Sequence, residues 1–438
     1  MAGHVTAGVV RFLGGRAAIV GLLSILVVYG IEAHARSHDR SSPATLGDQG
    51  AYLGYARHLY ESNYTVTEDR NRMPVYPFLL SLIYRPGMSD DEFLLRAQSF
   101  TVNLSIVLLL LLFFIFRRFF PPWPSLAFLA ATAFGVFIYR AGKAQVELLF
   151  YFVSFCAFVL LLQMFVRPRW WLALLAGAVT GLVHLTKASV LPALIVWAFV
   201  FGLQIIWHFR ARPWRSVGLL LIVLGSFLAV VFPYIQTSKR IYDAYFYNVN
   251  STFVMWCDSS TEAYDFLAAH GDKDQWREVP PDERPSFRKY WREHSVAQIM
   301  RRVFVGSCNI ATKNLRLIGY YKFVLALLVT VAVIAARSRR QAMEFFGRNA
   351  FAALFCLLFF ASYHFLYAWY DKIINDTRFV LSIFLPFLVA ASVFILRVER
   401  DRIVSLAGRR IPFDQFFSGL FLSLAAIDVV CNVSGVWS

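Results

Sequence analysis

The chain has 438 residues, of which 58% are hydrophobic, 17% are aromatic and only 16% are charged. Several apolar runs approach the roughly 20 residues that a helix needs to cross a bilayer, which excludes a soluble domain and predicts an all-α, polytopic membrane protein. The net charge of +16 does not indicate a nucleic-acid partner, because the basic residues lie in short clusters between apolar runs.

The first apolar segment runs from about Ala17 to Glu32 and follows Arg11 and Arg16. Positive charge on this flank predicts a cytoplasmic N-terminus and a first span that crosses outward. The run Ala33-His34-Ala35 also fits a signal-peptidase site, so a cleaved signal peptide is the alternative. Under both interpretations the next loop, residues 34–97, lies outside the membrane.

This first outer loop is polar and rich in Asp, Arg and Tyr. Apolar residues recur at helical spacing from Tyr52 and predict an amphipathic helix that lies on the membrane surface, with Arg57 and His58 on its polar face. A second short helix is expected from Pro74, because proline is tolerated in a first helical turn. We expect this second helix to offer four apolar residues to the bilayer: Tyr76, Leu79, Leu80 and Ile83.

Further apolar spans follow, and with the first they make about eleven transmembrane helices. They are expected at 98–116, 125–139, 146–166, 171–185, 190–207, 217–234, 323–335, 350–368, 379–396 and 416–430. Arginine clusters fall at every second junction, as the positive-inside rule requires: Arg117-Arg118, Arg167 with Arg169, Arg210 to Arg215, Arg337 to Arg340, and Arg397 to Arg402. The remaining junctions therefore face outward, and chemistry outside the membrane is confined to them.

The predicted organisation is an N-terminal transmembrane module over residues 1–235, an outer segment over 236–321 and C-terminal transmembrane helices over 322–438. The outer segment interleaves aromatic or aliphatic and basic residues between Phe287 and Val303, the pattern of an interfacial helix beside anionic headgroups. Cys257 and Cys308 are the two cysteines of this segment. An oxidising compartment would allow them to form a disulfide, although two unrelated thiols explain the count as well.

Asp48 follows the first span and is followed by Tyr and Ala at helical spacing and by Arg72-Met73-Pro74-Val75-Tyr76-Pro77. This order resembles the first outer loop of membrane glycosyltransferases of the GT-C superfamily, most closely the protein mannosyltransferases and the aminoarabinose transferases that modify lipid A. Those enzymes usually carry Asp-Glu where this chain has Asp48-Gln49.

Three later stretches extend the resemblance. Residues 181–187, which end in Thr186-Lys187, are similar to a run that closes a transmembrane helix in these transferases, and 376–379 with Pro386 resembles their late Arg-Tyr…Pro motif. Glu147, at the start of an apolar run, resembles their second acidic motif. The resemblance implies a GT-C-like fold and transfer of a sugar from a polyprenyl-phosphate donor to a glycan, lipid or protein acceptor at the outer face of a bacterial cell membrane.

Such a transfer requires a base for the incoming hydroxyl and cations for the departing phosphate. Asp48 and Glu147 are the candidate catalytic acids, and they are also a candidate site for a divalent metal ion. The candidate phosphate-binding residues are the cations near the outer membrane surface: Arg57, Arg72, Lys143, Lys187 and Arg378.

Each of these assignments has a structural alternative. Asp48 also suits a helix N-cap, and each cation also suits a solvated or snorkelling side chain. No nucleotide-binding or metalloprotease motif is present, so an outward-facing enzyme depends on a substrate that is already activated. A transporter or lipid-linked sugar flippase is the alternative function, and it would place charged sites near the bilayer midplane. A non-catalytic envelope scaffold is a further alternative.

Overall fold

A computed structural model describes residues 15–37, 47–65, 72–208, 213–270, 279–316, 318–374, 376, 378–406 and 408–433. Helices make up 82% of the structure, which confirms the all-α prediction. Among the described residues, nine helices are long and apolar enough to span a membrane, so the chain is a multi-pass membrane protein.

In the described parts of the first half of the chain, every secondary-structure element is a helix. Its elements are α2 (Arg16–Ser37), α3 (Gly47–Glu61), α4 (Val75–Ser81), α5 (Asp90–Phe119), α6 (Pro122–Thr132), the π-helix η1 (Ala133–Phe137), α7 (Ile138–Ala141), α8 (Glu147–Val166), α9 (Trp170–Thr186), the 3₁₀-helix η2 (Ala188–Val190), α10 (Leu191–His208) and α11 (Pro213–Tyr242).

The second half begins with short helices and ends with long ones. Its elements are α12 (Val249–Thr252), the 3₁₀-helix η3 (Val254–Trp256), α13 (Ser260–His270), α14 (Phe287–Glu293), α15 (Val296–Arg316), α16 (Ile318–Arg337), α17 (Arg339–Arg348), α18 (Ala350–Tyr370), α19 (Arg378–Leu381), α20 (Phe384–Val398), β1 (Ile403–Leu406), β2 (Arg409–Pro412) and α21 (Phe413–Val433).

Every expected span coincides with a helix or a run of helices. Nine of them are long enough to cross a bilayer, whereas α9 and α20 are apolar but shorter, with 17 and 15 residues. A total of eleven spans therefore stays a prediction.

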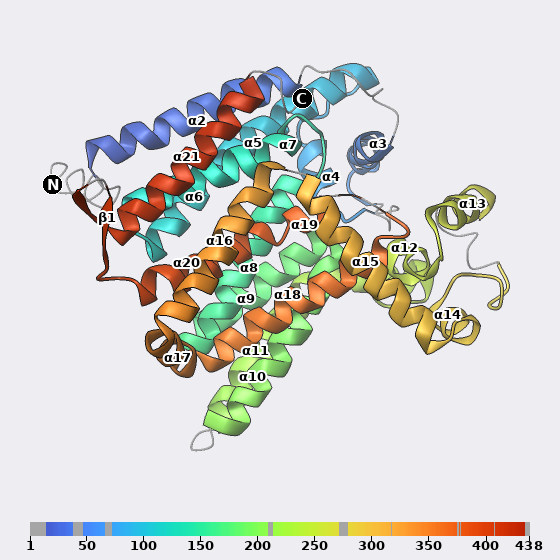
Figure 1. The fold of residues 1–438 in the computed structure, drawn as a ribbon. Coiled ribbons are helices and arrows are strands. Elements are labelled where there is room, and N and C mark those ends of the chain that lie inside the picture. Colours follow the sequence, from blue (N-terminus) through green and yellow to red (C-terminus); the bar gives the residue numbers. More distant parts are fainter. Residues whose placement is uncertain are drawn as a thin grey trace.

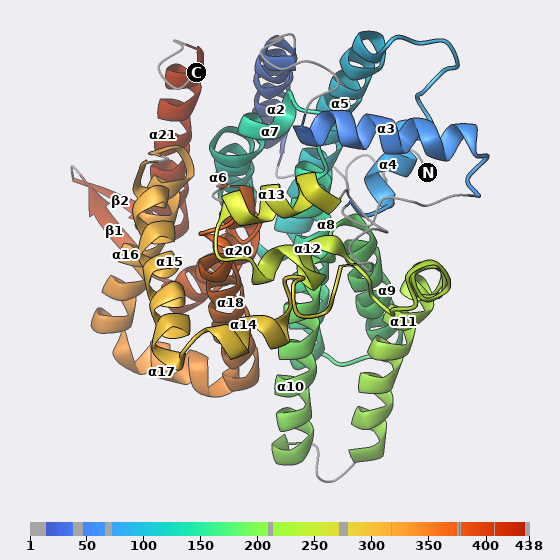
Figure 2. The same cartoon turned by 90° about the vertical axis from the view of Figure 1, so that its right-hand side faces the viewer.

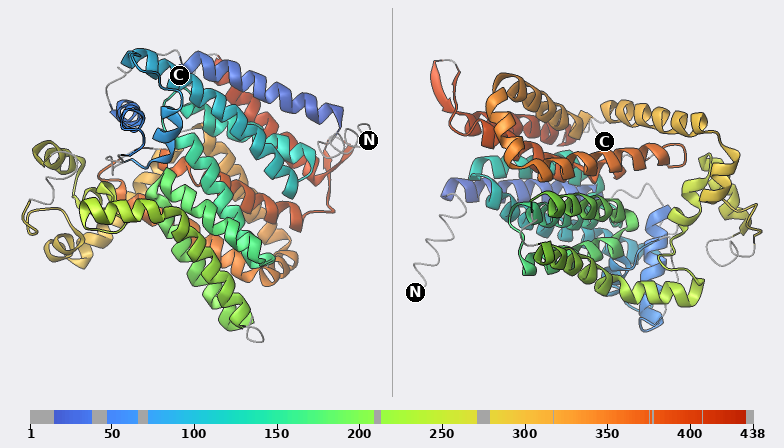
Figure 3. Two further views of the ribbon diagram at one scale, coloured as in Figure 1. Left: turned by 180° about the vertical axis from the view of Figure 1, so that it is seen from behind. Right: turned by 90° about the horizontal axis from the view of Figure 1, so that it is seen from below.

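The segments predicted to lie outside gather at one end of the helical bundle, which we call the α3 end. Figure 1 shows α3, α12, α13 and α14 together there, whereas α17 and the β1–β2 hairpin lie at the far end. Figure 2 faces the α3 end and shows α3, α12, α13 and α14 in front of the long helices. Both views of Figure 3 place the yellow segment with α13 and α14 on the opposite side of the bundle from the start of α2. The elements at the far end, which follow arginines predicted to face the cytoplasm, therefore lie opposite the segments predicted to lie outside the membrane.

The short helices of the first loop form where the sequence predicts them, but α4 is buried differently. Tyr76 and Leu80 are fully buried inside the protein, and the Tyr76 hydroxyl lies 2.7 Å from Thr101 Oγ1 on α5. The prediction that they face the bilayer was wrong, because α4 turns this face against α5. Its other face, with Phe78 and Leu82, is exposed.

Two elements near the far end were not predicted. Residues 403–412 form an antiparallel hairpin that pairs Leu406 with Arg409, and Gly408 adopts a positive φ of 77° in its turn. The helix α17 carries basic residues and apolar Met343 and Phe346, both exposed. From the sequence, only arginine-rich junctions were expected near them, at Arg337 to Arg340 and Arg397 to Arg402.

The predicted interfacial helix of the 236–321 segment corresponds to α14 and α15. Arg302 on α15 is only 2% exposed and stacks on the rings of Tyr290 and Trp369, with its Cζ 5.0 and 4.3 Å from their centroids. It therefore faces inward and not toward lipid headgroups, and it attaches the segment to α18. Cys257 is buried and Cys308 is exposed, and both are free thiols in this structure; their disulfide stays a prediction.

A close helix–helix contact joins α9 to α11. A Cβ added at Gly177 would lie 1.9 Å from Ser226 Oγ and 2.1 Å from Val223 O, and one added at Gly181 would lie 2.8 Å from Val230 Cβ. The two glycines are four residues apart on one face of α9, the spacing that lets membrane helices approach closely. This contact fixes the position of the residue that follows α9, Lys187.

Replacing Gly177 by Ala should destabilise the protein by about 1–3 kcal/mol, because the added methyl overlaps the backbone of α11. The matched control is Gly202→Ala on α10, where nothing lies within 4 Å of the added Cβ. Thermal unfolding in detergent measures both variants. Equal melting temperatures for the two would contradict the close α9–α11 contact.

Candidate active site

A cavity of about 290 Å³ opens at the α3 end of the bundle. It collects residues from the first loop, the starts of α8, α10 and α19, the ends of α9 and α18, and the 236–321 segment. Asp48, Arg72, Glu147, Lys187 and Arg378 all line it. Five of the residues that the sequence proposed for catalysis or phosphate binding are thus brought together.

Asp48 lies in the first turn of α3, where a carboxylate also interacts favourably with the helix dipole. Its Oδ1 accepts a hydrogen bond of 3.0 Å from Arg72 Nη2, and its Oδ2 pairs with Arg378 Nη1. Burial would raise the pKa of Asp48, but the charges and hydrogen bonds of Arg378 and Arg72 hold it below its ordinary value. The side chain keeps 32% exposure and is therefore reachable from the cavity.

Glu147 begins α8 and is the most buried of the cavity's charged groups, with a side-chain exposure of 2%. Its Oε1 lies 3.5 Å from both Lys187 Nζ and Arg378 Nη1. Its Oε2 is buried without a hydrogen-bond partner. A buried carboxylate is costly unless cations compensate it, so Glu147 holds these two cations in place.

Arg378 is the centre of the charged group. Besides Asp48 and Glu147, it pairs with Asp376, whose Oδ2 lies 3.1 Å from Arg378 Nε and whose Oδ1 accepts from the Arg378 backbone N–H at 2.9 Å. Arg140 Nη2 in turn lies 2.8 Å from Asp376 Oδ1. Burial would lower the pKa of Arg378, but Glu147, Asp48 and Asp376 raise it above its ordinary value. Arg378 is therefore a permanent cation.

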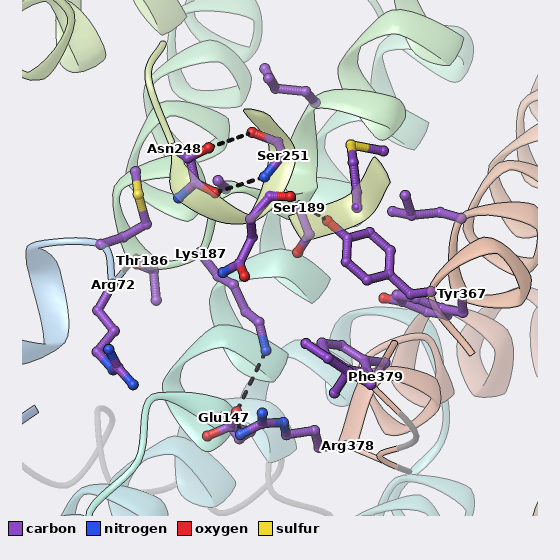
Figure 4. A pocket seen from close by; sticks show the side chains of 18 of the residues that line it. Arg72, Glu147, Thr186, Lys187, Ser189, Asn248, Ser251, Tyr367, Arg378 and Phe379 are labelled. Carbon is purple, nitrogen blue, oxygen red and sulfur yellow. Dashed lines mark hydrogen bonds and ion pairs between the residues drawn. The ribbon is translucent and has the colours of Figure 1, made fainter. Parts of the chain in front are cut away.

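Lys187 follows α9 directly and lies between two aromatic rings. Its Nζ is 5.4 Å from the ring centroid of Phe150 and 4.9 Å from that of Phe379. Burial lowers the pKa of Lys187, although Glu147 partly opposes this change. In Figure 4 its ammonium points across the cavity toward Glu147, beside which Arg378 lies.

The ion pairs of the cavity form one connected network. Among the described residues, four cations (Arg72, Arg140, Lys187 and Arg378) pair with three carboxylates (Asp48, Glu147 and Asp376). Three of the cations, Arg72, Lys187 and Arg378, line the cavity and can attract a ligand with negative charge.

Two proposed phosphate-binding residues are not part of the cavity. Arg57 pairs with Asp90 at the start of α5 and lies over the ring of Tyr84. Lys143 is exposed in the turn before α8. Arg57 lies outside the cavity because it is nine positions after Asp48 on α3 and projects toward α5. Neither residue is positioned to contact a ligand in this cavity.

Several contributors escaped the sequence analysis. Arg140 was not selected from the sequence, and Asp376 was selected only as part of a motif. They pair across 236 positions, so no local sequence pattern predicts the ion pair. Gln49, which stands where the resemblance leads one to expect Glu, is buried and accepts a hydrogen bond of 2.9 Å from the backbone N–H of Ala144. It thereby joins α3 to the turn before α8.

The geometry does not favour a metal ion between Asp48 and Glu147. The guanidinium of Arg378 pairs with both carboxylates and lies where a shared cation would be held. Within the described part of the chain, no three or more His, Cys, Asp or Glu side chains are grouped to bind a metal. We therefore derive no chemical step through a metal.

The chain matches no protein-family model, no curated protein and no solved structure.

Replacing Glu147 by Gln should lower the free energy of unfolding by about 1–3 kcal/mol, because Lys187 then loses the carboxylate that it pairs with and is repelled by Arg378. Adding Lys187→Met to this variant should recover part of the loss. The control is Asp282→Asn, whose pair with Arg292 is exposed and should contribute less than about 1 kcal/mol. If Glu147→Gln melts like this control, Glu147 does not hold the two cations.

Proposed function

We propose that the chain is an integral membrane glycosyltransferase that transfers a sugar from a polyprenyl-phosphate donor to an acceptor hydroxyl. The observation that carries the proposal is that three cations, Arg72, Lys187 and Arg378, line one cavity together with a carboxylate, Asp48, and an apolar wall. The active site would face outward from a cell membrane, and the acceptor would be a glycan, a lipid or a protein of the cell envelope.

The cavity suits the two chemically different parts of such a donor. Lys187, Arg378 and Arg72 offer cations to the phosphate. Leu191, Pro192 and Leu366 form apolar lining at the ends of two candidate membrane spans, α10 and α18, where an isoprenoid chain would leave for the bilayer.

The proposed reaction is a single displacement with inversion. The acceptor oxygen forms a bond to the anomeric carbon while the bond from that carbon to the phosphate oxygen breaks. The electron pair of the broken bond remains on the polyprenyl phosphate, and Lys187 and Arg378 stabilise the added negative charge. The proton of the acceptor hydroxyl passes to a carboxylate.

Asp48 fits the role of this carboxylate better than Glu147. Its side chain is 32% exposed, so an acceptor hydroxyl can reach it, whereas Glu147 is 2% exposed. Asp48 is ionised at neutral pH because Arg72 and Arg378 lower its pKa. When these arginines also bind a phosphate, their hold on Asp48 weakens and its basicity rises. Glu147 would act electrostatically, by holding the phosphate-binding cations.

Asp48→Asn should leave donor binding intact and lower turnover by about 100-fold or more, because the amide keeps the size of the side chain but cannot accept the proton. The assay follows turnover of polyprenyl-phosphate sugars by purified protein in lipid, with donor binding measured beside it. The control is Asp265→Asn, an exposed residue on α13. Full activity of Asp48→Asn on a donor used by the parent protein would remove Asp48 from the mechanism.

Lys187→Ala and Arg378→Ala should each weaken donor binding as well as turnover, because the phosphate is charged both in the substrate and at the departing oxygen. The control is Lys143→Ala, which removes a cation at the same end of the helical bundle but outside the cavity. This variant should bind donor normally. Equal loss in all three variants would indicate a general effect of surface charge and not a phosphate site.

The dependence of kcat/KM on pH should follow the ionisation of Asp48. Because its folded pKa lies below the ordinary 3.8, activity should persist down to about that pH and fall only as pH drops through the lowered value. Arg72→Gln removes one of the two cations that lower this pKa, so the acid limb should move to higher pH. An acid limb that stays in place in Arg72→Gln would contradict the assignment.

A further inference from the structure

The helix α17 (Arg339–Arg348) has an exposed side that the proposed function does not use. The helix joins two candidate membrane spans, Gly319–Arg337 and Ala350–Tyr370. Figures 1 and 2 show α17 at the far end of the bundle, across the ends of α16 and α18. A helix that connects the ends of two spans and crosses their direction lies along the membrane surface, where the acyl chains meet the headgroups.

Contacts to α20 hold α17 in this position. The rings of Phe346 and Phe394 stack with their centroids 5.1 Å apart, and the ring of Phe345 meets Phe394 edge to face at 5.4 Å. Just before α17, Ser338 Oγ donates a hydrogen bond of 2.6 Å to Glu399 Oε1, which follows α20. The exposed side therefore belongs to a helix that is already fixed, which limits the ordering cost of binding a ligand there.

Two neighbouring rows of side chains form the exposed side of α17. Met343 and Phe346, three positions apart, make an apolar row and are 63% and 44% exposed. Arg340, Glu344 and Arg348, spaced by four positions, make a charged row, and the side chains of the two arginines are 91% and 81% exposed. An apolar row beside a basic row is typical of a helix that lies in the interface of a membrane.

The charge of this side is positive. Arg340 Nε and Arg348 Nη2 share the carboxylate of Glu344, at 3.3 and 3.9 Å. Arg339 is also exposed, so α17 carries three arginines to one acid. Residues 1–14 and 209–212, which lie outside the described residues and are predicted to be on the same side of the membrane, contain no Asp or Glu. They therefore add no acid that could neutralise α17.

The connection between α20 and α21 has the same sign of charge. Residues 397–414 contain five arginines and three acids. One of these acids, Glu399, is already paired with Arg402 at 2.7 Å. In the hairpin of this connection, Ile403 and Leu406 are 58% and 52% exposed. The surroundings of α17 are therefore also basic and partly apolar.

Anionic phospholipids fit both rows of α17. Their phosphates accept charge-assisted hydrogen bonds from guanidinium groups. Their acyl chains, which begin directly below the headgroups, would cover the apolar row. An acidic soluble protein would pair with the arginines but would leave Met343 and Phe346 without an apolar neighbour. The combination of the two rows at the ends of two membrane spans therefore favours lipid.

We propose that α17 is a binding surface for anionic phospholipids of the leaflet at the far end of the bundle. Arg339, Arg340 and Arg348 contact the headgroups, and Met343 and Phe346 lie among the first carbons of the acyl chains. This surface is separate from the cavity at the α3 end, so the inference does not rest on the proposed function.

The test measures lipid binding to the full-length protein in detergent by native mass spectrometry, with equimolar phosphatidylglycerol and phosphatidylcholine of the same acyl chains. The parent protein should prefer phosphatidylglycerol. Replacing Arg339, Arg340 and Arg348 together by Gln should lower this preference by about tenfold or more, because each basic residue near an anionic surface strengthens binding by about fivefold. An unchanged preference in this variant would overturn the proposal.

A matched control removes the same charge from exposed positions outside α17, by replacing Arg85, Lys143 and Arg240 together by Gln. This control should keep the preference of the parent protein. An equal loss in both triple variants would show a response to total charge and would overturn the role of α17.

Glu344→Gln distinguishes the loss of a binding surface from misfolding, because it should change the preference in the opposite direction. It removes the carboxylate that Arg340 and Arg348 share, so the preference for phosphatidylglycerol should rise by about fivefold. A preference that stays the same or falls in this variant would contradict the proposal. None of the α17 variants changes a residue that lines the cavity, so the outcome does not depend on the proposed transfer reaction.

Discussion

The charge of Arg378 holds the α3 end of this protein together. One guanidinium pairs with Asp48 on α3, with Glu147 on α8 and with Asp376 just before its own helix. Asp48 lies 330 positions from Arg378 in the sequence. Without the cation, Glu147 would be an ionised group almost completely removed from water, which is unfavourable by several kcal/mol. The burial of Glu147 therefore requires Arg378 and Lys187 to be where they are.

This requirement has a consequence for chemistry. Groups held by mutual charge before a substrate arrives need little rearrangement when negative charge develops beside them. The same network keeps Asp48 ionised while leaving it accessible. Three of its cations, Arg72, Lys187 and Arg378, line the cavity. The phosphate of the proposed lipid donor would be attracted to these cations, and its chain would lie along the apolar lining beside them.

The remaining helices position the ends of this network. Close approach of α9 and α11 at Gly177 and Gly181 sets where α9 ends, and Lys187 follows at that end. The turn before α8 is attached to α3 through Gln49. Arg302, buried between Tyr290 and Trp369, attaches the 236–321 segment to α18, and residues of that segment line the cavity. Long helices thus supply rigidity, while short helices and turns supply nearly all of the polar groups.

The sequence by itself determined the apolar helices and the helical first loop. Hydrophobic runs of the right length leave the backbone no alternative to a helix in a bilayer, and the periodicity around Tyr52 is local. It also selected Asp48, Glu147, Arg72, Lys187 and Arg378, partly through their place at predicted outer junctions and partly through resemblance.

Only the tertiary structure separated these from Arg57 and Lys143, which lie at equally plausible positions in the sequence. Charge pairing depends on which helix ends meet, and nothing local records that Arg140 meets Asp376 or that Asn250 faces the cavity. Packing also decided that α4 faces α5 and that Arg302 faces α18. The sequence does not show this, because an apolar helix face has the same periodicity whether it packs against lipid or against protein.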